Sequence, residues 1–188
     1  MKKRMLFMIV FITSVFSGNA QGSFIKNRWN IKAGYAENDS FYPPEWSTKF
    51  IYADYRVEAN YGFMEFLEAG VYLGYTWIGT IEQVWSKWDS KNVGTPLLGL
   101  NLNFHPLTFL IRKPDFRFDL YLLARYGGYY LVAPAEYLPA RGFYFQYNHG
   151  AGLAFYLTKH IGVFGEYSYG VLAKPAGSLR CGLSLKFH

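Results

Sequence analysis

The feature that most constrains this chain is an alternation of apolar and polar residues that recurs in eight separate segments. A β-strand points successive side chains to opposite faces, so a period of two is typical of strands and not of helices. The abundance of aromatic residues (17 Phe, 17 Tyr and 5 Trp) and of Gly (19) agrees with an all-β chain. The alternating segments are residues 29–35, 51–61, 67–77, 98–104, 117–126, 144–155, 161–169 and 179–187.

The charged residues inside these segments all fall on one of the two faces. A soluble barrel, such as a lipocalin-like calyx, would turn its charged face to water. A transmembrane barrel would turn its apolar face to lipid, where Arg or Lys at mid-depth costs about 2–4 kcal/mol, and pair its charges inside. The charge-free apolar face therefore favours an all-β fold, an eight-stranded antiparallel up-and-down transmembrane β-barrel. The inward charges are Lys32, Asp54, Arg56, Glu58, Glu68, Arg117, Asp119, Arg125, Glu166, Arg180 and Lys186.

The connections alternate between long and short, as in barrels with long outer loops and short periplasmic turns. We expect long connections at 36–49, 79–95, 128–142 and 170–177, and short ones at 62–65, 105–115 and 158–160. The apolar run 107–111 either lengthens strands or lies at the membrane interface. The outer segments either present a binding surface or form an aromatic girdle on strands that continue outward. Their aromatic and apolar residues include Phe41, Tyr42, Pro43, Pro44, Trp46, Trp85, Trp88, Tyr129, Tyr130, Tyr137 and Leu138.

The N-terminus has the pattern of a secretory signal peptide. Three basic residues at 2–4 precede an apolar run at 5–16, and the small residues Gly18 and Ala20 follow. The run is shorter than the ~20 apolar residues of a membrane-spanning helix. We therefore expect a cleaved signal peptide at 1–20, an outer-membrane β-barrel domain at 21–188, and a location in the bacterial outer membrane. Past residue 20 the charges are 16 basic against 13 acidic with no polybasic run, which predicts no nucleic-acid partner.

The inward charges predict an ion-pair network inside the barrel. Glu166 and Arg180 are expected to be neighbours if the last hairpin is centred near Lys174, and Glu58 would face Glu68 if its hairpin is centred on Phe63. Inward glycines such as Gly99, Gly127, Gly152 and Gly162 leave room for Tyr52, Tyr72, Tyr121 and Tyr156. The predicted lumen network is Asp54, Arg56, Glu58, Glu68, Asp119, Arg125, Glu166 and Arg180.

The segments LEAGVYLGYTW, PLLGLNLNFHPL, GAGLAFYLTKHIGVFGEYSYG and LRCGLSLKFH resemble the small outer-membrane β-barrel family common in Bacteroidetes, which is similar in plan to OmpA-like and OmpW-like barrels. The resemblance implies a C-terminal assembly signal at Phe187, read by the outer-membrane barrel assembly machinery. It also implies a monomer in contact with outer-membrane lipid and lipopolysaccharide. The implied roles are envelope integrity, surface contact, or binding or passage of a small apolar ligand.

No residue pattern predicts catalysis, a metal or a cofactor. His105, His160 and His188 stand at connections or the terminus, where we expect them to be exposed, and the single Cys181 excludes a multi-cysteine site. His149 favours a second hypothesis, a lipid A-modifying enzyme (deacylase or acyltransferase). The nucleophilic serine of the deacylase family would stand at position 151, which is Ala151, and Glu166 points inward. A non-enzymatic protein is therefore the preferred interpretation.

Overall fold

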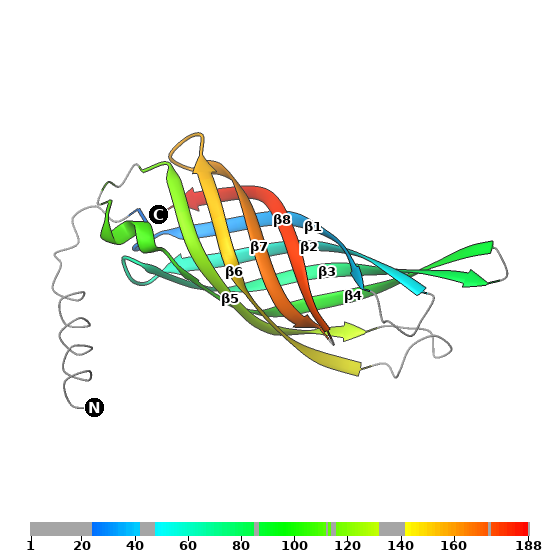
Figure 1. The fold of residues 1–188 in the computed structure, drawn as a ribbon. Coiled ribbons are helices and arrows are strands. Elements are labelled where there is room, and N and C mark those ends of the chain that lie inside the picture. The colour runs from blue at the N-terminus through cyan, green and yellow to red at the C-terminus, as the bar shows by residue number, and fades with distance from the viewer. Residues whose placement is uncertain are drawn as a thin grey trace, which may run out of the picture.

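Eight strands follow one another around a closed barrel in which every neighbouring pair is antiparallel (Figure 1). The computed structural model describes residues 24–41, 48–84, 87–111, 113, 116–131, 142–172 and 174–187. The predicted eight-stranded up-and-down barrel is confirmed, and the predicted signal peptide at 1–20 lies outside the described residues. The strands are β1 (Trp29–Phe41), β2 (Thr48–Gly62), β3 (Leu67–Val84), β4 (Lys87–Phe104), β5 (Phe118–Leu131), β6 (Gly142–Tyr156), β7 (Ile161–Leu172) and β8 (Lys174–Phe187).

Along the strands, buried and exposed side chains alternate, and the buried face is the one that the sequence predicts to point inward. Outward side chains are apolar and exposed, for example Val71 at 53% and Leu100 at 61%, while the inward charges are buried. Arg117 is an exception, because it precedes the first residue of β5 and its side chain is exposed. β5 begins at Phe118, so the prediction that Arg117 lies within a strand is wrong. No helix in the described part of the chain is long and apolar enough to cross a membrane.

Inward glycines make room for inward tyrosines, as predicted. A Cβ atom added to Gly99 would lie 2.5 Å from the hydroxyl oxygen of Tyr72, and Gly127 faces the same hydroxyl. Tyr121 covers Gly152, and Tyr156 lies against Gly162. The corresponding prediction for Tyr52 falls outside the side chains that the structure describes. Aromatic rings therefore fill part of the lumen by packing against the backbone at the glycine positions.

The hairpins at one end of the barrel are longer than the sequence predicts. The expected loop at 79–95 is mostly strand, because β3 and β4 remain paired out to Val84 and Lys87, and β7 pairs with β8 out to Leu172 and Lys174. Figure 1 shows the β3–β4 hairpin projecting beyond its neighbours. Backbone hydrogen bonds alone define the ladder, so pairing can continue past the residues at which alternation ends. Residues 42–47, 85–86 and 132–141, which include half of the predicted outer aromatic residues, lie outside the described residues.

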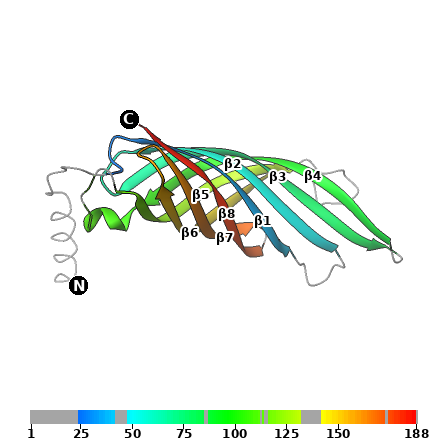
Figure 2. The same cartoon turned by 90° about the horizontal axis from the view of Figure 1, so that it is seen from above.

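The opposite end, which we call the short-turn mouth, holds the β2–β3, β4–β5 and β6–β7 connections and the end of β8. Figure 2, turned by 90°, shows the same grouping. The apolar run after His105 forms a 3-10 helix, η1 (Pro106–Phe109), so the alternative that it lengthens strands is wrong. The Phe109 ring packs 5.2 Å from Phe66 and 5.9 Å from Phe104, and Leu110 is 81% exposed. Pro106 supplies no backbone N–H for a ladder, which explains why β4 ends there.

Replacing Gly152 by Ala should destabilise the barrel, because the new methyl group would overlap the Tyr121 ring, which is buried and bonded through its hydroxyl to Glu166. We expect a loss of about 1–3 kcal/mol in the free energy of unfolding, measured by denaturant titration of the folded barrel. Gly165→Ala is the matched control, since a Cβ atom there meets nothing within 4 Å. Equal stability of the two variants would contradict this packing.

Candidate functional site

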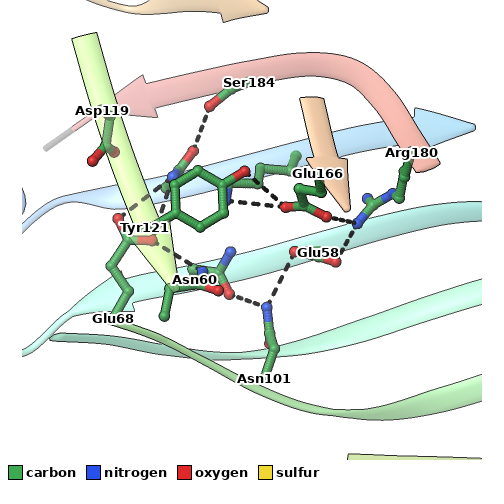
Figure 3. A network of polar contacts seen from close by, with 12 residues as sticks. Glu58, Asn60, Glu68, Asn101, Asp119, Tyr121, Glu166, Arg180 and Ser184 are labelled. Atoms are coloured by element: carbon green, nitrogen blue, oxygen red, sulfur yellow. Dashed lines mark hydrogen bonds and ion pairs between the residues drawn. The ribbon is translucent and has the colours of Figure 1, made fainter. Parts of the chain in front are cut away.

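A buried ionic cluster crosses the middle of the lumen and joins strands that are not neighbours. Arg125 of β5 donates through Nε to Glu58 Oε1 of β2 at 2.9 Å and through Nη2 to Glu166 of β7. Arg180 of β8 donates to Glu166 Oε2 at 3.1 Å and also to Glu58. Figure 3 shows Glu58, Glu166 and Arg180 converging between the strands. All four side chains are buried, so the cluster ties one wall of the barrel to the other.

Three further side chains complete the hydrogen bonds of the two carboxylates. The Tyr121 hydroxyl donates a hydrogen bond to Glu166 Oε1 at 2.8 Å, and Lys32 Nζ lies 3.5 Å from the same oxygen. The Lys32 ammonium also lies 3.5 Å from the centroid of the Tyr121 ring. Asn101 donates to Glu58 Oε2 at 3.2 Å. Every oxygen of Glu58 and Glu166 therefore has a donor, which is what buried carboxylates require.

A second cluster lies nearer the short-turn mouth and is centred on His105. Its Nδ1 is 2.9 Å from Asp119 Oδ1, and its Nε2 is 3.4 Å from Glu68 Oε2. Lys186 Nζ lies 3.5 Å from the other oxygen of Asp119, and Asn30 donates to Glu68 at 3.4 Å. Burial of the ring lowers the pKa of His105, because it disfavours the charged imidazolium. The negative charges of Asp119 and then Glu68 have the larger combined effect and raise the pKa to about 9. The ring is therefore a cation held between two carboxylates.

The prediction that His105 is exposed is wrong, because the ring has 0% exposure. The alternation of β4 could have predicted that His105 points inward. Asn101 and Asn103 are buried on the inner face, and His105 is the next residue at the same spacing of two. The prediction that His160 is exposed is confirmed; its Nδ1 is 2.9 Å from the carbonyl oxygen of Lys186. His188 lies outside the described residues.

The structure brings the eight predicted network residues together in three groups. Glu58, Arg125, Glu166 and Arg180 form the central cluster, and Glu68 and Asp119 meet at His105. Asp54 and Arg56 form a separate ion pair on β2, with the Arg56 guanidinium 4.8 Å from the centroid of the Tyr72 ring. The sequence prediction omitted Lys32, Lys186, Tyr121 and Asn101 from the network, although all four have the inward parity of their strands.

The two expected hairpin registers have different outcomes. Glu166 is directly opposite Arg180, as predicted. Glu58 is opposite Tyr72 and Glu68 is opposite Gly62, so the prediction that the two glutamates face each other is wrong. The β2–β3 turn is centred on Glu65 and not on Phe63, and this shift of two residues moves each glutamate away from the other.

His149 and Glu166, the two residues considered for catalysis in the sequence analysis, lie on opposite faces of the barrel wall. His149 is exposed on β6, with its ring 5.6 Å from Tyr147 and 6.0 Å from Tyr169, while Glu166 is buried on the opposite face of the wall. Among the residues that the structure describes, no group of three or more His, Cys, Asp or Glu side chains could hold a metal ion. Phe187 lies at the end of β8 opposite Trp29 of β1 and is 43% exposed.

No known protein-family model matches the chain, and no curated protein matches it. Among solved structures it is similar to the N-terminal β-barrel domain of OprF from Pseudomonas aeruginosa, with a TM-score of 0.60 and 16% identity over 86% of this chain and 98% of that domain. It also matches the attachment invasion locus protein Ail of Yersinia pestis, with a TM-score of 0.48 and 16% identity over 87% of this chain and all of that one. At this identity the OprF likeness concerns the fold, that of a small eight-stranded outer-membrane barrel, and nothing in it is specific to Bacteroidetes.

Replacing Glu166 by Gln should lower the free energy of unfolding by about 3–5 kcal/mol, because three cations then surround one carboxylate. Adding Arg180→Met should recover part of that loss, since one excess cation is removed. A double-mutant cycle from denaturant titrations in lipid vesicles measures the coupling. Arg117→Met, which removes an exposed cation, should show no coupling to Glu166→Gln. Coupling near zero for both pairs would contradict the network.

The stability of the barrel should fall as the pH rises from about 6.5 to about 9. A folded-state pKa of about 9 for His105, above its ordinary value of 6.5, means that the imidazolium stabilises the fold fully below pH 6.5 and that this contribution is lost by pH 9. The loss should be of order 3 kcal/mol. Unfolding titrations at several pH values measure it, with His105→Gln flattening the profile in this window. The control His149→Gln should keep the wild-type slope, and an unchanged slope in His105→Gln would refute the assignment.

Proposed function

We propose that this protein is a bacterial outer-membrane β-barrel that acts without catalysis, through envelope integrity and surface contact. The observation that carries the proposal is the inverted distribution of polarity in a closed barrel. Charged residues such as Glu58 and Arg125 are buried inside, whereas large apolar residues such as Leu98, Leu100 and Leu183 are exposed outside. A soluble barrel would leave this apolar belt in water, while lipid accepts it without cost.

The filled lumen supports a structural or surface role over passage of aqueous solutes. Arg125, Glu166 and Tyr121 are buried together inside the barrel. The Tyr72 hydroxyl reaches Gly127, two residues beyond Arg125 on β5, and Tyr156 lies against Gly162 near the start of β7. Small barrels of eight strands have interiors that side chains can fill. The long β3–β4 hairpin at the far end from the short-turn mouth is then the part best placed for contact outside the cell, facing lipopolysaccharide and whatever lies beyond it.

The short-turn mouth is assigned to the periplasm in this proposal, with Phe187 as the terminal aromatic that the assembly machinery reads. The mature chain would be a monomer delivered across the inner membrane by the signal peptide at 1–20. The lipid A-modifying alternative has less support, because His149 has Ala151 where the serine would stand and its nearest predicted partner, Glu166, is inside the barrel.

Leu100→Arg tests the membrane assignment directly. Leu100 lies on the outer face of β4, four residues from the end of the strand at the short-turn mouth, near mid-depth for a span of about 10 residues. In phospholipid vesicles the variant should lose about 2–4 kcal/mol of unfolding free energy. Leu157→Arg is the matched control, because Leu157 is equally exposed but lies in the β6–β7 turn, and its stability should change by less than about 0.5 kcal/mol.

If Leu100→Arg and Leu157→Arg were equally harmless and the protein remained folded in buffer without detergent, the soluble interpretation would replace the membrane barrel. The non-enzymatic part of the proposal is tested separately by mass spectrometry of lipid A from cells with and without the protein. We expect identical lipid A. An acyl or headgroup difference that His149→Ala abolishes would establish the enzymatic alternative instead.

A further inference from the structure

Residues 24–28, which lead into β1, are buried in the short-turn mouth although they belong to no strand. Phe24 is 1% exposed and Ile25 is 0% exposed. Side chains of a segment that only led into a strand at the rim would stay partly exposed, so these two residues are interior residues. The alternating pattern begins at Trp29 and therefore did not identify them.

A turn fixes this segment against the inner wall at the end of β2. Asn27 N donates to the carbonyl oxygen of Gly62 at 2.7 Å, and Gly62 N donates to that of Arg28 at 2.9 Å. Asn27 has a φ of 59°, a left-handed conformation that asparagine adopts more readily than most residues. Gly62 is opposite the buried Glu68, and a Cβ atom on Gly62 would lie 2.1 Å from the Ile25 carbonyl oxygen. The Ile25 backbone therefore lies directly on the bare backbone of Gly62.

The Phe24 ring reaches the opposite side of the mouth. Its centroid is 5.7 Å from that of Phe116, which precedes β5, and 5.1 Å from Lys186 Nζ of β8. In a closed ring of eight strands β5 is opposite β1, so a segment that leads into β1 and contacts Phe116 spans the opening. Together with the contact of Ile25 on β2, the segment touches three parts of the wall.

A recess of about 230 Å³ on the outer side of Phe24 marks where the open space of the mouth ends. Phe24, Tyr156 and Lys186 line the recess, and each is at most 3% exposed. Ser184, two residues further into the barrel on β8, is 0% exposed. Its Oγ is 3.0 Å from the Tyr156 hydroxyl oxygen and donates to Asn30 Oδ1 at 2.7 Å. The polar interior therefore begins directly behind the residues that line the recess.

We propose that residues 24–28 form a plug that seals the lumen at the short-turn mouth and keeps water-soluble molecules away from Ser184 and the ionic clusters. Exclusion of water strengthens the ion pairs of His105, because charges attract more strongly where the dielectric constant is low. The plug deepens the proposed structural role, since it closes one end of the barrel to passage. It rests on that role only for naming the sealed side periplasmic.

The test measures how fast a charged methanethiosulfonate reagent reaches the thiol that Ser184→Cys introduces. The mature protein is folded in maltoside micelles and carries Cys181→Ala, which removes the only native thiol. With the plug intact, this thiol should react about tenfold or more slower than the one that Thr158→Cys places at the exposed mouth. Adding Phe24→Ala/Ile25→Ala should accelerate the reaction at position 184 about tenfold or more, because the apolar contacts that hold the plug are lost.

Gly62→Ala is a second way to displace the plug, since the new methyl group would overlap the Ile25 carbonyl while the plug keeps its own sequence. It should accelerate the same reaction. Leu110→Ala/Leu157→Ala is the matched control, because it truncates two exposed apolar residues at the same mouth, and the rate should stay within about twofold. Unboiled gels show that each variant is folded.

Equal rates at positions 184 and 158 with the plug unaltered would overturn the proposal before any plug variant is made. Unchanged rates in folded Phe24→Ala/Ile25→Ala and Gly62→Ala would also overturn it, as would equal acceleration by the control. Because the reaction is measured in micelles, its outcome is independent of the Leu100→Arg experiment in vesicles, which alone decides the membrane location.

Discussion

The structure depends on how two carboxylates, Glu58 and Glu166, are held in the middle of the barrel, buried from the solvent. Removing an ion from water costs several kcal/mol, and the cost is offset only if the geometry is good and every oxygen has a donor. The donors come from β1, β4, β5 and β8, whereas the carboxylates stand on β2 and β7. A slip of one residue in any of these strands would turn a partner outward. The ionic cluster thus selects the register of the whole barrel, including pairs of strands that share no hydrogen bond.

Glycine and tyrosine determine the space that this cluster occupies. Gly99 and Gly127 are directly paired across β4 and β5, and together they leave the patch of bare backbone that receives the hydroxyl end of Tyr72. Gly34 and Gly182 are paired in the same way on the β1–β8 seam, where Arg180 and the Phe164 ring lie against Gly34. Large inward residues at these sites would push the rings and guanidinium groups out of reach of one another. The charge pairs of the lumen therefore depend on the close packing that these glycines allow.

The sequence predicted the parts of the molecule that depend on a period of two. The number of strands, the face of each strand and the opposition of Glu166 and Arg180 follow from alternation and from one short hairpin. The period of two does not determine where a turn is centred. The β2–β3 turn is centred on Glu65, two residues beyond the predicted centre, and the predicted pairing of Glu58 with Glu68 was therefore wrong. The contact between Arg125 and Glu58 was beyond prediction for another reason: β2 and β5 are not neighbours, and their approach depends on the curvature of the closed barrel.

Asp119 joins two cations of the lumen near the short-turn mouth. One of its oxygens meets His105 and the other meets Lys186, so the carboxylate is shared between two cations. Glu68 supplies a second negative charge, because its Oε2 lies 3.4 Å from His105 Nε2, so two carboxylates face the imidazolium and the ammonium. The residue that sequence analysis placed in solvent therefore joins Asp119 of β5 to Glu68 of β3, two strands that are not hydrogen-bonded neighbours in the barrel.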